Sequence, residues 1–161
     1  MTDPSGLYER YAPEVFRFAL YLSADRDEAA DITSETFVRA WTAPEPIRMA
    51  TVKGYLFTIA RNLYLQGLRR KGRHVEMDRA LEERIADPGA SPQTQVEARS
   101  EMLAVLAALQ KLPEVDRAAL LMRAMDELPY EEIARALGIS LAAVKVKIHR
   151  ARLALSGVRN V

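Results

Sequence analysis

Apolar side chains recur at intervals of three and four residues along most of this chain, which is the spacing of one face of an α-helix. No alternating run of β-branched residues bounded by turn residues predicts a strand. We therefore expect an all-α fold. Three N-terminal helices are predicted over residues 7–22, 25–41 and 52–70. Their expected inward-facing residues are Leu7, Tyr11, Val15, Phe18 and Leu22, then Ala30, Phe37, Ala40 and Trp41, and finally Tyr55, Leu56, Ile59, Leu63 and Leu68.

Proline and glycine divide the predicted helices into two groups. Residues 43–48 contain two prolines and are expected to form a loop, and Pro, Gly and Ser cluster in residues 87–92, where apolar residues become sparse. Further helices are expected over residues 98–112 and 116–125, separated by Pro113. The interpretation is two small helical domains, residues 1–74 and 98–161, joined by a flexible acidic linker over residues 75–97.

Composition excludes several kinds of site. Hydrophobic residues make up 49% of the chain, enough for a packed core, and cysteine is absent, so disulfides, thiolate zinc sites and cysteine nucleophiles are excluded. The two histidines are far apart in sequence and no glycine-rich phosphate loop is present, so we expect no enzyme, no metal and no cofactor. No signal-peptide pattern and no apolar run of the ~20 residues that span a bilayer is found.

The net charge of +1 conceals two strongly basic segments. Residues 53–73 hold six basic and no acidic side chains, and residues 140–161 hold five and none. The rest of the chain is acidic. Two solvated helix faces would normally mix both signs of charge, so two separate contacts with a polyanion are the favoured interpretation.

The C-terminal basic segment follows a short amphipathic stretch, Tyr130–Gly138, and the pair predicts a helix-turn-helix. Gly138 is expected to end the first helix in a left-handed conformation, and Ser140 to cap the second. The expected buried stripe of the second helix is Val144, Ile148, Ala151 and Leu155. By reach, phosphate contacts are assigned to Lys147 and Arg152, and base-edge contacts to Lys145, Val146, His149 and Arg150. For His149 the alternative is an exposed imidazole with no role.

The N-terminal basic segment, residues 52–74, interleaves its cations with Tyr55, Phe57 and Tyr64. Aromatic rings beside cations suit single-stranded nucleic acid, because rings stack on bases while the cations follow phosphates. The alternative is that the aromatic residues belong to the core and that residues 69–73 are a solvated helix end. Arg61 and Asn62, polar residues within an otherwise apolar helix, fit that alternative least well.

Three stretches together resemble one known family. LFTIARNLYLQGLRR resembles the promoter-melting helix of the extracytoplasmic-function (ECF) group of bacterial sigma factors, and DEAADITSETFVRAW resembles the polymerase-binding helix before it. LPEVDRAALLMRAMDELPYEEIARALGIS and VKVKIHRARLAL resemble the C-terminal domain of the same family. The motifs occur in the family's order and cover nearly the whole chain.

The resemblance implies a specificity subunit of RNA polymerase, with region 2 in the first domain and region 4 in the second. It implies contacts with core polymerase through Asp31, Glu35 and Arg39. It implies contacts with the −10 element through Lys53, Tyr55, Arg61, Asn62, Arg69 and Arg70, with a flipped base captured by the loop of residues 43–51. It implies contacts with the −35 element through Ser140, Ala142, Lys145, Val146, Lys147, His149, Arg150 and Arg152.

The resemblance also sets expectations about partners. Core RNA polymerase and promoter DNA are the expected partners, with no small-molecule substrate. The family commonly has an anti-sigma factor, so a monomer or a 1:1 complex with such a partner is expected. The expected location is the bacterial cytoplasm, or the membrane surface through the anti-sigma partner.

Some positions depart from the family's usual pattern. Gln66 stands where the family usually has Asp, Tyr55 where it often has Trp, and Ala142–Ala143 where it usually has Gly-Thr. Val146 replaces a residue that is commonly polar, which suggests an apolar contact such as a thymine methyl group. The competing hypothesis is a helix-turn-helix repressor or activator that works without polymerase. It accounts for residues 113–161 but leaves the basic aromatic helix without a role, and it predicts a dimer on a palindromic site.

Overall fold

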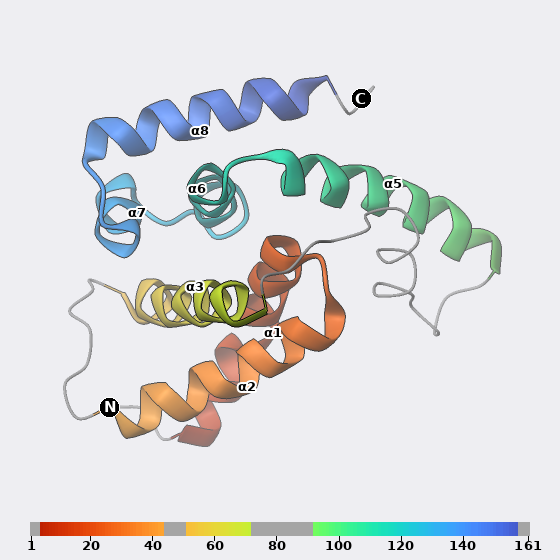
Figure 1. The fold of residues 1–161 in the computed structure, drawn as a ribbon. Helices are drawn as coiled ribbons and strands as arrows, with labels where there is room; N and C mark the ends of the chain where they lie inside the picture. The colour runs from red at the N-terminus through yellow and green to blue at the C-terminus, as the bar shows by residue number, and fades with distance from the viewer. Residues whose placement is uncertain (1–3, 44–50, 72–91, 158–161) are drawn as a thin grey trace.

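A computed structural model describes residues 4–43, 51–71 and 92–157, and every regular element within these ranges is an α-helix. The N-terminal helices are α1 (Pro4–Ser23), α2 (Arg26–Thr42) and α3 (Val52–Lys71). The C-terminal helices are α5 (Pro92–Lys111), α6 (Glu114–Ala124), α7 (Tyr130–Leu137) and α8 (Leu141–Ser156) (Figure 1). The predicted all-α fold is confirmed. Among the described helices, none is both long and apolar enough to cross a membrane.

Helices α1, α2 and α3 pack together around aromatic rings. The rings of Phe18 and Phe57 stack with centroids 4.6 Å apart, joining α1 to α3. The turn between α1 and α2 is tight: Ala24 adopts a left-handed conformation with φ of 58°, and the Asp25 side chain caps α2 by accepting a hydrogen bond from the Glu28 amide. The Asp25 cap therefore stabilises the turn at which the chain reverses between α1 and α2.

Most of the expected inward-facing residues of these helices are buried or half-buried, but two predictions were wrong. Ala30 is exposed, because the buried side of α2 runs through Ala29, Thr33 and Phe37, and Ala30 lies one position off that stripe. Trp41 is 38% exposed; it lies in the last turn of α2 and its ring contacts that of Phe37 at 6.1 Å. Phe37 therefore belongs to the core, whereas Trp41 lies at the edge of the core.

The predicted helix-turn-helix is confirmed in α7 and α8. Gly138 ends α7 with φ of 69°, and the Ser140 hydroxyl accepts a hydrogen bond from the Ala143 amide at 3.1 Å. Val144, Ile148 and Ala151 are buried, as expected, and Leu155 is half-buried.

Helix α5 begins at Pro92, so six residues assigned to the linker are helical. Two predicted segments fall outside the described residues. They are the remainder of the linker, residues 75–91, and residues 44–50 of the base-capturing loop.

The two groups of helices pack against each other. Helices α6 and α7 lie over α1 and α3, so that segments more than 50 residues apart in sequence are side by side (Figure 1). The Gln110 side chain of α5 donates a hydrogen bond to the Tyr21 carbonyl of α1 at 3.1 Å. Buried apolar residues of both groups form one continuous cluster. The sequence interpretation of two domains joined by a linker therefore needs one addition, a direct interface between them.

Candidate nucleic-acid interface

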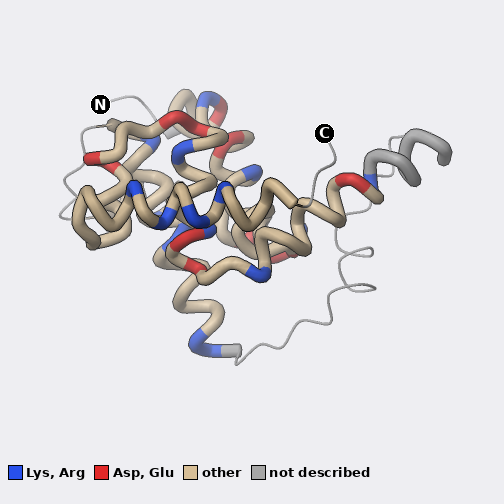
Figure 2. The backbone as a smooth tube through the Cα atoms, turned by 90° about the horizontal axis from the view of Figure 1, so that it is seen from above, with Lys and Arg blue, Asp and Glu red and all other residues tan. Residues whose placement is uncertain are grey.

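Helix α8 presents a basic surface without acidic residues. Figure 2 looks down on this helix, which crosses the view with basic positions along it and no acidic one. Lys145, His149 and Arg152 are exposed on one flank, and Val146 is 58% exposed on the side away from the core. Side chains placed in this way on a helix-turn-helix can reach base edges and phosphates in a DNA groove.

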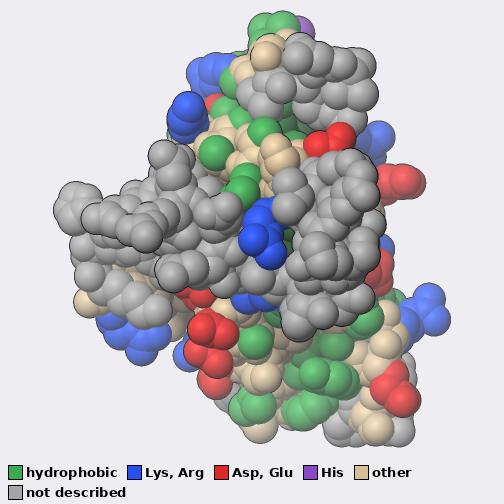
Figure 3. Space-filling view, turned by 90° about the vertical axis from the view of Figure 1, so that its right-hand side faces the viewer, with side chains coloured by type: hydrophobic (Ala, Val, Ile, Leu, Met, Phe, Trp, Pro, Cys, Tyr) green, Lys and Arg blue, Asp and Glu red, His purple; other side chains and the backbone are tan. Residues whose placement is uncertain are grey.

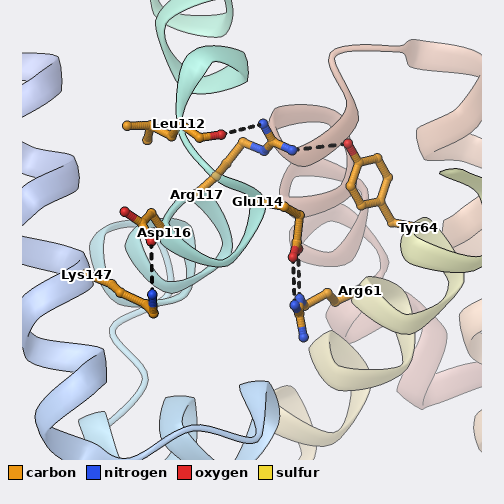
Figure 4. Close-up of polar contacts among 7 residues, drawn as sticks. All are labelled: Arg61, Tyr64, Leu112, Glu114, Asp116, Arg117 and Lys147. Atoms are coloured by element: carbon orange, nitrogen blue, oxygen red, sulfur yellow. Dashed lines mark hydrogen bonds and ion pairs between the residues drawn. The ribbon is translucent and has the colours of Figure 1, made fainter. Parts of the chain in front are cut away.

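A buried acid holds the other flank of α8. Asp116 of α6 is almost fully buried; Lys147 Nζ lies 3.5 Å from its Oδ1, and Arg150 Nε donates a hydrogen bond to its Oδ2 at 3.0 Å (Figure 4 shows the contact with Lys147). The hydrogen bond from Arg150 and the charge of Asp116 raise the pKa of the Arg150 guanidinium above its ordinary value. The sequence assigned Arg150 to bases and Lys147 to phosphates; the structure shows that one carboxylate orients both.

An aromatic ring supports the opposite flank. The Tyr130 ring, at the start of α7, lies 4.8 Å from the Arg123 guanidinium and 6.0 Å from Lys145 Nζ. Arg123 also donates a hydrogen bond to the Leu128 carbonyl at 3.1 Å. Cations placed over a ring face are attracted by its quadrupole. Tyr130 thereby connects the turn before α7 to a basic residue of α8.

On α3, three of the predicted −10 residues share one exposed stripe. Tyr55, Asn62 and Arg69 are spaced by seven residues, which brings them to nearly the same angle on the helix. Asn62 and Arg69 are exposed and Tyr55 is half-buried. This stripe combines a ring, an amide and a cation on one accessible surface of the helix.

The other predicted −10 residues lie elsewhere. Arg61 is 8% exposed and faces α6, where its Nε and Nη2 donate to the two carboxylate oxygens of Glu114 at 2.8 and 2.7 Å (Figure 4). Lys53 is half-buried, with Nζ 2.9 Å from Glu14 Oε2 and 4.0 Å from Asp126 Oδ1. Both cations are occupied by carboxylates, so in this arrangement they are not available to DNA.

A further carboxylate lies against the start of α3. Glu132 of α7 is buried and accepts hydrogen bonds from the Thr51 hydroxyl at 2.7 Å and the Thr51 amide at 3.3 Å. Gly54 allows this approach, because a Cβ there would lie 2.8 Å from Glu132 Cδ. Nearby, Arg117 donates to the Tyr64 hydroxyl at 3.2 Å (Figure 4). Sequence reasoning missed these interdomain partners, because no local pattern connects residues 53 or 81 positions apart.

The predicted polymerase-binding residues line a groove between α2 and α3. A cavity of about 550 Å³ is lined by Asp31, Glu35 and Arg39 of α2 and by Arg70 of α3, among others. Arg39 Nε donates to Glu35 Oε2 at 3.3 Å across one helical turn. Arg70, predicted to contact −10 DNA, is exposed beside Arg69 and also lines this groove. Among the described residues, no group of His, Asp or Glu is arranged to hold a metal ion.

Several large hydrophobic side chains are exposed on the N-terminal helices. In Figure 3 hydrophobic side chains gather on the lower part of the visible face, over the N-terminal helices, with acidic and basic side chains at the margins. The exposed large hydrophobic residues of these helices are Tyr8, Val38, Trp41 and Val52. Val38 lines the groove between α2 and α3 and gives it an apolar wall beside its charged residues.

Comparison with known proteins identifies the family. Residues 7–74 match the model of sigma-70 region 2, and residues 102–155 match that of sigma-70 region 4. SigM of Bacillus subtilis, an ECF RNA polymerase sigma factor, is 30% identical over 155 residues, covering 96% of this chain and 93% of SigM. SigE of Mycolicibacterium smegmatis is 36% identical over 148 residues, which cover 91% of this chain and 57% of SigE.

Solved structures agree on the fold. CnrH, solved in complex with the cytosolic domain of CnrY, superposes with a TM-score of 0.69 at 25% identity, covering 96% of this chain and 86% of CnrH. The sigma factor RpoE of Bartonella quintana, solved with the anti-sigma factor NepR, gives 0.72 at 24% identity, covering 94% and 92% of the two chains. Two region matches in family order, a match to SigM over nearly its full length and a shared fold lead to one conclusion: this chain belongs to the ECF RNA polymerase sigma factors of the sigma-70 family.

Proposed function

We propose that this sigma factor divides promoter recognition between its two basic helices. Helix α8 enters the −35 duplex, and the α3 stripe of Tyr55, Asn62 and Arg69 contacts the opened −10 strand. The observation that carries this proposal is the charge of the two helices: α3 from Lys53 onward and all of α8 contain no acidic residue in a chain whose other segments are acidic. Arg61 joins the −10 surface when Glu114 of α6 leaves, whereas Lys53 keeps its contact with Glu14 of α1.

The groove between α2 and α3 is the proposed binding site for core polymerase. Asp31 and Glu35 supply its negative charge, while Ile32, Leu63 and Val38 supply apolar contact. A helix of the partner with apolar and basic residues on one face would fit such a groove. Arg39 lines the same groove, and its hydrogen bond to Glu35 orients the two side chains.

A matched pair of variants tests this site. Asp31→Lys reverses a charge in the groove, whereas Asp27→Lys makes the same change at an exposed position of α2 that does not line it. Asp31→Lys should weaken binding to core polymerase by at least ~10-fold, and Asp27→Lys should have little effect. Equal weakening by both variants would show that long-range charge, and not this groove, governs binding to core polymerase.

Reconstitution with core polymerase tests the function as a whole. The purified chain should bind core polymerase and direct initiation from defined start sites, which mapping of transcript 5′ ends would reveal. A chain that fails to bind core polymerase yet binds isolated duplex DNA tightly would instead be a polymerase-independent repressor or activator. Because such proteins usually bind palindromes as dimers, sedimentation of the DNA-bound chain separates the two cases.

We also propose control by an anti-sigma factor. Two proteins of similar fold, CnrH and RpoE of Bartonella quintana, were each solved with a partner chain, and NepR is named as an anti-sigma factor. In this sigma factor such a partner would act in the bacterial cytoplasm or at the membrane surface, by holding the two domains together. Co-purification of a 1:1 partner from the native host tests this proposal, and recovery of the chain free of any such partner would count against it.

A further inference from the structure

We infer that Glu114, Asp126 and Glu132, here called the acidic edge of the C-terminal domain, cover one side of the −10 surface of α3 in the free chain, at Arg61 and at the start of the helix, and compete there with the DNA strand. The inference rests on the proposed role of α3 in binding the opened strand. It adds an intramolecular ligand for that surface, supplied by the chain itself. DNA can bind fully only when α6 and α7 move away from α3.

Each carboxylate of the acidic edge occupies donors on or beside α3. Glu114 accepts two parallel hydrogen bonds from Arg61, with only 10% and 18% of the two side chains exposed. This forked geometry is also the one in which an arginine binds a phosphate group. Glu132 accepts from both donors of Thr51, the residue just before α3 begins. These donors therefore meet carboxylate oxygens in the positions where phosphate oxygens would bind.

Asp126 adds a third, looser contact. Its Oδ1 lies 3.7 Å from Arg17 Nη2 and 4.0 Å from Lys53 Nζ, and within the described part of the chain neither of its oxygens accepts a hydrogen bond. Burial of this side chain raises the pKa of Asp126 to about 6, which shows that the charged form is poorly solvated there. A buried carboxylate without hydrogen bonds makes the closed interface costly, so the closed state can be displaced.

The Glu132 side chain of α7 packs so closely on Gly54 of α3 that it leaves no room for a Cβ there. A Cβ on Gly54 would lie 2.8 Å from Glu132 Cδ and 2.9 Å from Glu132 Cγ, closer than such atoms normally approach. Gly54 lies in the first turn of α3, where alanine is the better helix former. A methyl group at this position would therefore disturb the contact with Glu132 while favouring the helix itself.

The test uses the full chain and a fluorescent single-stranded oligonucleotide of random sequence. The double variant Glu114→Gln/Glu132→Gln removes two charges of the acidic edge while keeping side-chain size. The matched control, Glu101→Gln/Glu131→Gln, removes two charges from exposed positions of α5 and α7. Gly54→Ala opens the interface from the other side without changing any charge. A pair of spin labels at Glu9→Cys and Ala154→Cys reports the separation of the domains, since the chain has no other cysteine.

Removal of the acidic edge should raise affinity for the oligonucleotide by ~10-fold over the matched control, because apparent affinity scales with the open fraction. Gly54→Ala should also raise affinity, and both should lengthen the distance between the labels. Affinities of the double variant and its control that agree within error would overturn the inference. So would a label distance that stays the same in both opened variants, since the acidic edge would then not hold the domains together.

Failure of the proposed function gives a different result. In that case the opened variants would show the longer label distance but bind neither the oligonucleotide nor core polymerase. The acidic edge would then not compete with DNA, because α3 would not bind DNA. Both the proposed role of α3 and the proposed competition would be wrong. Opened variants that bind core polymerase normally but gain no affinity for the oligonucleotide would overturn only the competition.

Discussion

Asp116 is the residue on which the orientation of the α8 cations depends most. Its buried carboxylate contacts Lys147 and Arg150, which lie three positions apart on α8. The buried acid limits where these long side chains can point, although 57% of the Arg150 side chain remains exposed. An oriented guanidinium can form the paired hydrogen bonds with guanine that a freely rotating one forms less often.

Arg150→Ala should relax specificity at one position of the −35 element. Loss of a bidentate contact with guanine costs ~1–3 kcal/mol of discrimination against the wrong base. The measurement is the affinity of the reconstituted polymerase for a −35 duplex with each base substituted in turn. If affinity falls equally for every sequence, Arg150 contacts a phosphate and the assignment to a base is wrong.

Asp116→Asn should have a different effect. Without the carboxylate charge, Lys147 and Arg150 are free to contact phosphates, so binding to all duplexes should strengthen while discrimination falls. The slope of log affinity against log salt concentration should steepen by ~1–2, because each added phosphate contact contributes ~0.9. Glu131→Gln removes the same charge from an exposed position of α7 and serves as the control. An unchanged slope in Asp116→Asn would show that the two cations already contact phosphates.

At the scale of the element, the turn between α7 and α8 determines how α8 is presented. Its geometry rests on Gly138, whose φ of 69° is unfavourable for any residue with a Cβ, and on the Ser140 cap. No atom outside the local turn lies within 4 Å of a Cβ at Gly138. Backbone conformation alone therefore requires glycine at this position.

Gly138→Ala should lower the free energy of unfolding by ~1–2 kcal/mol, the cost of placing a Cβ in the left-handed region. Gly157→Ala is the matched control, because Gly157 also ends a helix but has φ of −83° and open space around it. That control should leave stability unchanged or slightly raised. Denaturant titration monitored by circular dichroism measures both. Equal effects of the two substitutions would contradict the role given to the turn.

Local signals of this kind explain which parts of the structure could be predicted. The ends of α7 and α8 depend on one glycine and one serine, and the buried stripe of α8 depends on a simple spacing, so both follow from nearby residues. The pairing of Arg61 with Glu114 joins residues 53 positions apart and has no sequence periodicity. The sequence shows that Arg61 is a polar residue within an otherwise apolar helix, and the family resemblance assigns it to −10 DNA, but its carboxylate partner in another domain leaves no local signal.

At the scale of the molecule, the two proposed DNA-binding surfaces differ in how accessible they are. The exposed flank of α8 is open to solvent, whereas Arg61 of α3 is covered by Glu114 of α6 and Lys53 is paired with Glu14 of α1. The groove proposed to bind core polymerase lies between α2 and α3, and its lining residues come from these two helices. Core polymerase can therefore engage the closed chain first, and separation of the domains can follow.

The closed state should depend on pH through Asp126. Burial raises the pKa of Asp126 from 3.8 to about 6, while Lys53 and Arg17 partly oppose the shift and Glu14 adds to it. In an open chain the carboxyl is solvated and its pKa returns towards 3.8. Between these two values the closed chain binds a proton that the open chain does not, so closure strengthens as pH falls through about 6.

The open fraction, measured with the spin-label pair, should therefore be smaller at about pH 5 than at about pH 8. Asp126→Asn should remove this dependence, because its side chain stays neutral throughout. Opening of the chain on acidification would contradict the account. An equal pH dependence in Asp126→Asn would assign the effect to another group.

The most direct measurement of the central claim is the label distance between Glu9→Cys and Ala154→Cys with and without core RNA polymerase. The account predicts one short distance in the free chain, replaced by a longer one when core polymerase is added in slight excess. The same sample should then initiate at defined promoters. A distance that stays short while the chain is bound to core polymerase and transcribing would contradict the claim that the acidic edge covers Arg61 of α3 in the free protein and moves away for function.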